Sequence, residues 1–291
     1  MKHTRGEKVF YTLNNIFLFI IGLSCLLPIV HVLALSLSDK HALMSGTVSF
    51  WPVNLSFDGY KALFKESPII TDFKNSVIIT VVGTCLNIVF TILAAYPLSK
   101  RYFIGRKFYS FAIVFTLIFS AGLIPTYLLV QKLGLLNSYG ALWLPGLIAV
   151  YNLLVLRTFF EGLPEELEEA SRIDGCSEWR LIVQIVLPLS LPVLAALTLF
   201  YGVAHWNAFL NVLIFINDSS KLNLAVLVQQ MIQNQTLVQE LTNTQPEAAA
   251  LITPEGVKAA GVIVITVPML IVYPFLQRFF VKGVLIGAVK G

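Results

Sequence analysis

The densest charge in the sequence lies between residues 161 and 180, where EGLPEELEEASRIDGCSEWR contains seven acidic and two basic side chains. Paired carboxylates can act as a general acid and base, but such sites usually also contain a histidine, a nucleophile or a metal ligand. The segment contains no histidine, and Cys176 is its only thiol. The acids are therefore better suited to a charged contact with another surface than to catalysis, and no metal site is predicted.

The same segment has the pattern of a short helix with two different faces. Pro164 suits a first helical turn, where its missing N–H is not needed, and the acids that follow suit the positive end of a helix. Gly175 is expected to end the helix, and Glu168 and Arg172 have the i,i+4 spacing of an ion pair. Apolar residues recur along one face at helical spacing: Leu163, Leu167, Ala170 and Ile173.

Three settings fit such a helix. It could be a solvated loop helix, it could lie on the bilayer surface, or it could dock on a cytoplasmic protein. An acidic face would be repelled by anionic lipids, which counts against the bilayer surface. The spacing of the residues alone leaves the solvated helix and the docked helix open.

The elements that would position this helix are long apolar runs. Of the 291 residues, 57% are hydrophobic and only 12% are charged, whereas soluble proteins have about 25% charged residues. Six runs without Asp, Glu, Lys or Arg are each long enough for a membrane-spanning helix, which needs roughly 20 residues. The sequence therefore predicts an all-α polytopic membrane protein with six transmembrane helices. The predicted spans are at about 14–38, 75–99, 108–131, 134–157, 188–216 and 257–277.

Basic residues indicate the orientation of these spans, because short loops rich in Lys and Arg stay on the cytoplasmic side. They gather in the N-terminal tail, the loop after the second span and the C-terminal tail: Lys2, Arg5, Lys8, Lys100, Arg101, Arg106, Lys107, Arg278, Lys282 and Lys290. We therefore expect both termini and the acidic segment in the cytoplasm. The outer segment 218–256 either contacts a partner or is a solvated loop, and its sequence favours neither.

Polar residues inside the predicted spans are candidates for a solute path. They form a stripe at helical spacing in the second span and a short cluster in the fifth: Thr84, Asn87, Thr91, Trp206, Asn207 and Asn211. Such groups could line an aqueous path for a hydroxyl-rich solute. Hydrogen bonds between neighbouring helices explain each residue, taken singly, at least as well, so both roles stay open.

At the acidic segment, the sequence resembles the EAA loop of ABC-importer permeases. The family pattern is E-A-A, three residues, G, nine residues and then I-x-L-P. It is matched here by Glu169-Ala170-Ser171, Gly175 and the run Ile185 to Pro188. Ser171 replaces the second alanine, which exchanges one small residue for another. Over nearly its whole length, the sequence also resembles the carbohydrate-uptake, maltose-permease-like branch of this family.

This resemblance implies a single type I permease domain over residues 1–291, with 161–187 as a cytoplasmic coupling loop. In the family, this loop forms a coupling helix that passes movement from a separate ATPase to the membrane helices. The resemblance implies that Glu169 pairs with a basic group of the ATPase, that Ala170 allows close approach and that Gly175 gives the bend. The coupling residues carried over by position are Glu169, Ala170, Ser171, Asp174 and Gly175.

The resemblance also implies the task and the partners. We expect import of a sugar or oligosaccharide through a bacterial plasma membrane, without a cofactor, a metal or a nucleic acid. The expected partners are a second, different permease subunit, a cytoplasmic ATPase dimer and an extracellular solute-binding protein. The sequence contains no phosphate-binding G-x-x-x-x-G-K-[ST] loop, so ATP hydrolysis is expected in the separate subunit and no catalytic residue is predicted.

Two other functions compete with this one. An ion-coupled secondary transporter or channel usually needs an ionisable group inside the membrane, and none of the six predicted spans contains a carboxylate. A membrane enzyme would need a cluster of His, Asp and Glu near a membrane surface, and the acids of the segment 161–178 have no neighbouring histidine.

Overall fold

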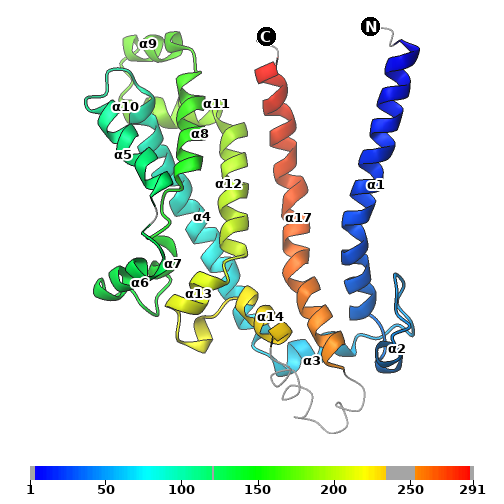
Figure 1. The fold of residues 1–291 in the computed structure, drawn as a ribbon. Coiled ribbons are helices and arrows are strands. Elements are labelled where there is room, and N and C mark those ends of the chain that lie inside the picture. The colour runs from blue at the N-terminus through cyan, green and yellow to red at the C-terminus, as the bar shows by residue number, and fades with distance from the viewer. Residues whose placement is uncertain (1–3, 120, 234–252, 289–291) are drawn as a thin grey trace. The chain divides into compact units, whose positions relative to one another are not determined.

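The computed structural model describes residues 4–119, 121–233 and 253–288. In these ranges the regular elements are helices, as the sequence predicts (Figure 1). Residues 234–252, the middle of the predicted outer segment, lie outside the described residues. The chain separates into two compact units: Met1–Ile70 with Leu227–Val267, and Thr71–Val226 with Pro268–Gly291. The single permease domain expected from the sequence stays a prediction.

The first unit contains α1 (Arg5–Ser36) and the short helices that follow it. α1 begins at a capping box: the Glu7 N–H donates to the Thr4 side chain, and the Thr4 N–H donates to the Glu7 side chain. Most apolar side chains of α1 are exposed, as expected of a helix in contact with lipid. The unit also contains α2 (Lys40–Ser45), α3 (Asp58–Glu66) and parts of α14 (Leu224–Gln233) and α17 (Pro254–Ala288).

The second unit contains the residues predicted to have a function. Its long helix is α4 (Ile69–Ser99), whose first two residues belong to the other unit. The elements that follow α4 are α5 (Arg106–Ile118), α6 (Leu123–Lys132), α7 (Gly140–Trp143), α8 (Val150–Glu161), α9 (Glu165–Ile173), α10 (Glu178–Leu181), η1 (Ile182–Val186), α11 (Leu187–Leu189), α12 (Leu191–Trp206), α13 (Leu210–Phe215) and η2 (Ser219–Lys221).

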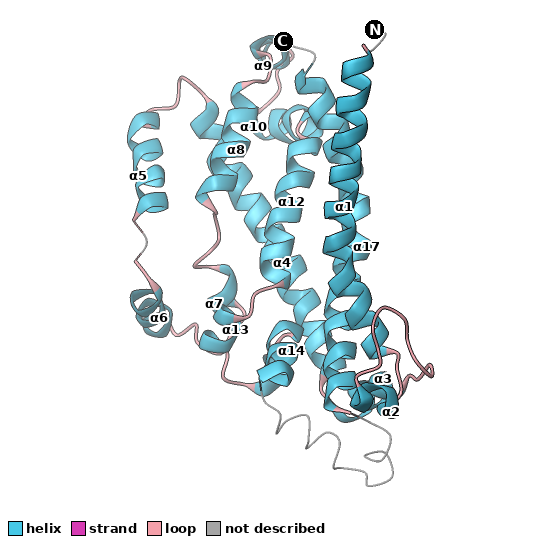
Figure 2. Ribbon diagram, turned by 45° about the vertical axis from the view of Figure 1, so that its right-hand side comes forward, coloured by secondary structure: helices cyan, strands magenta, loops and turns pink. Residues whose placement is uncertain are grey.

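A hydrophobic core holds the second unit together. Ile92 of α4, Leu156 of α8 and Leu197 of α12 are buried in one cluster. Figures 1 and 2 both show α8 and α12 side by side, with α9 at one end of the unit and α6, α7 and α13 at the other. The short acidic helix is therefore held at the end of a packed group of apolar helices.

Three helices in the described ranges are long and apolar enough to cross a membrane without a break. They are α1 without its first residue, α4, and the part Pro254–Phe275 of α17. These helices correspond to the first, second and sixth predicted spans. For these three predicted spans, a continuous helix is confirmed.

The other three predicted spans are broken, which the sequence prediction did not include. The span 188–216 is divided after α11, and the helical segments on either side of Ser190 meet at 83°. Both α11 and α12 have a proline in the first turn, where it needs no intrahelical hydrogen bond. The span 108–131 is divided at Gly122, which has a φ of +83°, and the span 134–157 is divided between α7 and α8.

The early start of α4 corrects one argument made from the sequence. The second span is predicted at 75–99, but α4 begins at Ile69 and has Asp72 in its first turn. Asp72 is 2% exposed, and its Oδ1 atom has no hydrogen-bond partner among the described residues. The predicted span 75–99 contains no carboxylate, but the helix that includes it has this buried one in its first turn. The absence of a carboxylate from the predicted span is therefore not an argument against an ion-coupled transporter.

Candidate functional site

Helix α9 ends in a motif that sets the direction of the chain after it. Gly175 has a φ of +74°, a left-handed conformation that favours glycine. Its N–H donates to the Arg172 carbonyl at 3.1 Å, and the Cys176 N–H donates to the Ser171 carbonyl at 3.0 Å. These two bonds form a Schellman motif, which satisfies carbonyls that a helix end leaves free. The predicted end of the helix at Gly175 is confirmed.

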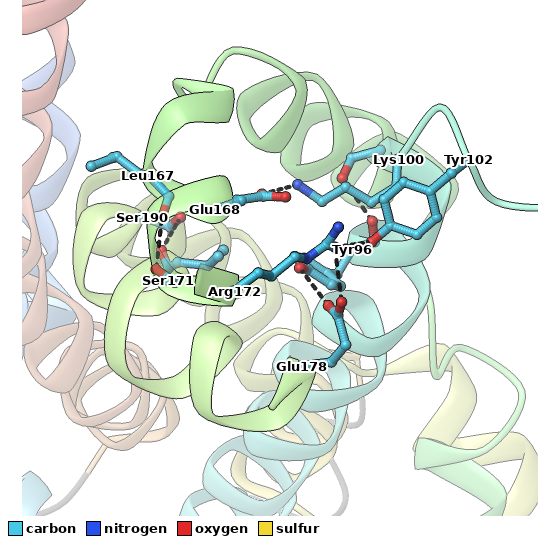
Figure 3. Close-up of polar contacts among 11 residues, drawn as sticks. Tyr96, Lys100, Tyr102, Leu167, Glu168, Ser171, Arg172, Glu178 and Ser190 are labelled. Atoms are coloured by element: carbon cyan, nitrogen blue, oxygen red, sulfur yellow. Dashed lines mark hydrogen bonds and ion pairs between the residues drawn. The ribbon is translucent and has the colours of Figure 1, made fainter. Parts of the chain in front are cut away.

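The two faces of α9 have different surroundings. Ser171 is buried, at 5% exposed, and its Oγ donates to the Leu167 carbonyl at 2.6 Å (Figure 3). Leu167 and Ile173 are 42% and 86% exposed, and Ala170 is also exposed. The apolar residues predicted for one face are thus present, but the described part of the chain leaves most of them uncovered.

The predicted ion pair between Glu168 and Arg172 is wrong. Glu168 pairs instead with Lys100, which directly follows α4, and the two side chains are 12% and 11% exposed. Lys100 is 68 residues away in the sequence, so its position beside Glu168 depends on the fold. An i,i+4 pair on a helix surface contributes only about 0.2–0.5 kcal/mol. Lys100, which reaches the Glu168 carboxylate from the more buried side, therefore takes the place of Arg172 as its partner.

Arg172 belongs to a second group of contacts. Its Nη2 donates to Glu178 Oε1 at 2.8 Å and to the Tyr102 hydroxyl at 2.8 Å. The hydrogen bond with Tyr102 raises the pKa of Arg172 above its ordinary value, so the guanidinium stays charged. The Tyr96 hydroxyl donates to the other Glu178 oxygen at 3.1 Å (Figure 3). Glu178 therefore connects α9 with the last turn of α4.

Most of the predicted coupling residues are exposed. Glu169, Ala170, Asp174 and Gly175 are exposed, whereas Ser171 is buried. Glu169 lines a cleft of about 450 Å³ between α9 and the basic loop that follows α4. Among the described residues, neither the Glu169 nor the Asp174 carboxylate has an ion pair. The structure thus places four of these residues at the surface of one short segment.

Sequence reasoning missed the residues that hold α9 from the side of α4. Tyr96, Lys100 and Tyr102 were not predicted as site residues. Two neighbouring ion pairs were missed too: both Arg106 and Arg157 donate to Glu161, at the end of α8. The sequence did contain one indication of these ion pairs: a basic loop and an acidic segment were both expected in the cytoplasm. Opposite charges on one side predict attraction, but they do not predict which residues pair.

Asn87, in the polar stripe of α4, forms hydrogen bonds between segments. Its Nδ2 donates to the carbonyls of Gly146 and Leu147, both at 2.8 Å, and its Oδ1 lies 2.5 Å from His205 Nε2. Gly83 leaves the space for this imidazole, because a Cβ there would lie 2.6 Å from His205 Nε2. Asn87 therefore joins α4 to α12 and to the chain before α8.

The other predicted path residues differ in burial and bonding. The hydroxyls of Thr91 and Tyr201 are 2.8 Å apart, which joins α4 to α12 a second time. Thr84 is 8% exposed, and its Oγ1 has no partner among the described residues. Trp206 is buried, whereas Asn207, which directly follows α12, is exposed.

A cavity of about 380 Å³ lies among α4, α6, α7, α12 and α13. Its polar lining comes from five side chains: Asn87, Thr126, Tyr201, His205 and Asn211. Of the six predicted path residues, the cavity thus brings together Asn87 and Asn211. It combines apolar walls with a few amide, hydroxyl and imidazole groups, as small-molecule sites do.

A glycine-ended acidic helix at the end of bent apolar helices is the arrangement of an ABC-importer membrane subunit. The chain belongs to the family described as "Binding-protein-dependent transport system inner membrane component", whose model matches residues 87–286. The matched range contains α9, the basic loop after α4 and all residues that line the cavity.

Relatives and a solved structure are similar over nearly the whole chain. Protein LplC of Bacillus subtilis (strain 168) is 41% identical, over 100% of this chain and 98% of its own length. The polygalacturonan/rhamnogalacturonan transport system permease protein YtcP of the same organism is 40% identical, over 98% and 99%. A chain of a bacterial ABC transporter involved in the import of the acidic polysaccharide alginate superposes with a TM-score of 0.86 at 28% identity. The superposition covers 96% of this chain and 99% of that one.

These similarities confirm the class that the EAA-like segment predicted. The protein is a transport permease subunit with the all-α type I fold; it is not an enzyme, and its ATPase is a separate subunit. It is a multi-pass protein of the bacterial plasma membrane that works with a partner permease, an ATPase and a binding protein. The ion-coupled transporter or channel is not supported.

Proposed function

We propose that this chain is one half of an oligosaccharide importer, and that its segment 161–187 docks on the ATPase and drives the membrane helices. The polygalacturonan and alginate named for two similar proteins are saccharide polymers, which supports a carbohydrate solute. The solute reaches the chain from an extracellular binding protein. The second permease subunit is a different protein, and two copies of the ATPase complete the assembly.

The contrast between the two sides of α9 carries the docking proposal. Its inner side is fixed by buried Ser171 and by the pairing of Glu168 with Lys100. The Glu169 carboxylate is exposed at the edge of the cleft, and Ile173, one turn further along α9, is exposed towards the outer side. Large apolar side chains exposed on a protein surface mark interaction sites, and a carboxylate among them favours a basic partner. This arrangement supports the docked helix over the solvated one.

We also propose that α9 and both chain termini face the cytoplasm. Residues 100–107, which form the loop after α4 and the start of α5, are basic and lie at the same end of their unit as α9 (Figure 1). Short basic loops stay on the cytoplasmic side of a membrane. This orientation puts the uncovered face of α9 where an ATPase can reach it.

For the solute path, we propose the cavity that Asn87 and Asn211 line. The three hydrogen bonds of Asn87 hold its amide in place, while Asn211 is exposed and available to a sugar hydroxyl. Thr84, Thr91, Trp206 and Asn207 stay predicted path residues, with contacts between helices as the alternative role.

Replacing Glu169 by lysine tests the docking proposal. The change puts like charge against the basic group expected on the ATPase, and losing a charged contact of this kind costs about 2–5 kcal/mol. That loss weakens docking by well over tenfold, since about 1.4 kcal/mol is a factor of ten. Glu169→Lys should therefore abolish oligosaccharide uptake and reduce co-purification of the ATPase. The amount of protein in the membrane should not change, because Glu169 touches no span.

Lys132→Glu is the matched control. It also reverses the charge of an exposed side chain, but at the end of α6, at the opposite end of the same unit. Uptake and ATPase binding should be normal in this variant. Normal uptake by the Glu169→Lys protein, with its ATPase still bound, would contradict the proposal.

A further inference from the structure

Two groups of polar contacts join the end of α4 to the segment 161–187. The first is the pair of Lys100 and Glu168, and the second is the set in which Tyr96 and Arg172 both bind Glu178. We infer that Tyr96 and Lys100 are positioning residues that fasten the coupling segment to α4, so that both move together when the ATPase displaces α9. This inference rests on the proposed function and adds to it the helix that receives the movement.

The first contact is well protected from water. Lys100 and Glu168 are 11% and 12% exposed, so water competes little for either charge. The Lys100 ammonium also lies 4.8 Å from the centre of the Tyr96 ring, within cation–π range. Tyr96 is 6% exposed and packs edge-on against Phe160, with ring centres 6.1 Å apart. Lys100 is thus held between α9 and the buried core, unlike an ordinary surface lysine.

The second contact acts further along the coupling segment. Glu178 uses one oxygen for the Tyr96 hydroxyl, at 3.1 Å, and the other for the Arg172 guanidinium, at 2.8 Å. Arg172 lies in the last turn of α9, and Glu178 is the first residue of α10. With Glu168 in the middle of α9, the segment is held to α4 at two separate points (Figure 3). Two points prevent α9 from turning about a single contact.

These contacts supply a connection that the backbone does not. Helix α12 follows the coupling segment directly after Ser190, whereas α5 to α8 separate the segment from α4. The cavity needs both helices, because Asn87 comes from α4 and Tyr201 and His205 come from α12. With α4 fastened to α9, a displacement of α9 reaches both walls of the cavity. Without this fastening the displacement would reach α8 and α12 through the backbone, and α4 only through its packing against those two helices.

The test is a distance between two spin labels in the fully assembled importer. One label replaces Leu93 on α4 and the other replaces Ser177 between α9 and α10, both of which are exposed. The three native cysteines, Cys25, Cys85 and Cys176, are changed to serine. The distance is measured by electron paramagnetic resonance without nucleotide and again with ATP and vanadate. We expect one narrow distance distribution that is the same in both states.

Charge variants then show whether the ion pair is responsible. Lys100→Glu should lose the single narrow distribution, because two carboxylates then face each other. The exchange Lys100→Glu with Glu168→Lys should restore it. Lys107→Glu is the matched control: it reverses an exposed charge in the first turn of α5, just after the same basic loop, and should leave the distribution narrow.

Co-purification of the ATPase separates this inference from the proposed function. The Lys100→Glu complex should keep its ATPase, because Glu169 is unchanged. The inference is overturned if the distance differs between the two nucleotide states, if the charge exchange does not restore it, or if Lys100→Glu loses the ATPase. Each of these results leaves the docking proposal standing. That proposal fails separately, if Glu169→Lys retains both ATPase binding and uptake.

Discussion

Two polar clusters of helix α4 use different chemistry. At its end, Lys100 pairs with the Glu168 carboxylate and Tyr96 donates to that of Glu178. Nearer its middle, Asn87 and Thr91 bind carbonyls, an imidazole and a hydroxyl. Ionised side chains are costly inside a membrane, whereas neutral groups that satisfy one another are tolerated there. Charge is therefore used where the helix leaves the membrane, and neutral hydrogen bonds are used within it.

This difference implies different responses to substitution. A Glu168 carboxylate that loses Lys100 can turn towards water, because it lies beside the open cleft lined by Glu169. The groups that Asn87 binds lie between helices, where the cavity that Asn87, Gly146 and His205 line is the nearest source of another partner. Stability should therefore depend more on the inner cluster, and coupling should depend more on the outer one.

Replacing Asn87 by leucine should have the largest effect on stability. The change leaves three polar groups without this partner: the carbonyls of Gly146 and Leu147, and His205 Nε2. A fully buried group that loses its partner costs about 1–3 kcal/mol, and the cost is smaller here for the carbonyl of Gly146, which is an exposed residue. The apparent midpoint of thermal unfolding in detergent should fall clearly, and it should fall less in Lys100→Met. Equal falls in the two variants would contradict the distinction between the clusters.

Replacing Gly175 by valine should have an intermediate effect that appears in coupling. The residue has a φ of +74°, and an added Cβ would meet nothing within 4 Å, so the strain is in the backbone alone. A left-handed conformation costs an L-residue roughly 1–2 kcal/mol. The protein should be inserted and abundant, and oligosaccharide uptake should fall.

Gly134 offers a matched control for this variant. It has a φ of +66°, its surroundings are equally open, and it lies between α6 and α7, at the other end of the unit. Gly134→Val carries the same backbone strain without touching the coupling segment. If both variants lose uptake to the same extent, the effect is general strain, and the special role of the bend at Gly175 is refuted.

The features that the sequence predicted correctly are local ones. The helix end at Gly175 follows from one residue type and its neighbours. The continuous helices α1 and α4 follow from apolar runs of sufficient length. The EAA-like spacing of Glu169 and Gly175 indicated the class of protein, and the family match confirms it.

The features that the sequence did not predict depend on residues far apart in the chain. Glu168 was assigned to Arg172 because helical spacing was the only geometry available, while its partner Lys100 comes from a different helix. Apolar runs also do not reveal breaks such as the 83° bend at Ser190, since proline is compatible with either a kink or a first turn. The burial of Ser171, at the position where the chain departs from E-A-A, appears only once α9 is packed.

The smallest expected effect on stability distinguishes Thr91 of the inner cluster from Thr84, which lies about two turns before it on α4. Thr91 is fully buried and shares a 2.8 Å hydrogen bond with Tyr201, whereas the buried Oγ1 of Thr84 has no partner among the described residues. Thr91→Val should destabilise the protein by about 1 kcal/mol, because it removes a made hydrogen bond. Thr84→Val should be neutral or slightly stabilising, because it removes a buried polar atom that is not satisfied.

Uptake by the Thr84→Val variant then decides between the two roles left open for this residue. A hydroxyl that only packs between helices can be replaced by a methyl group without loss of transport. A hydroxyl that meets the passing solute provides a hydrogen bond that valine cannot replace, so uptake falls although the unfolding midpoint does not. If instead Thr84→Val lowers the midpoint as much as Thr91→Val does, its hydroxyl has a protein partner. The neutral cluster on α4 then extends one turn further, from Asn87 and Thr91 to Thr84.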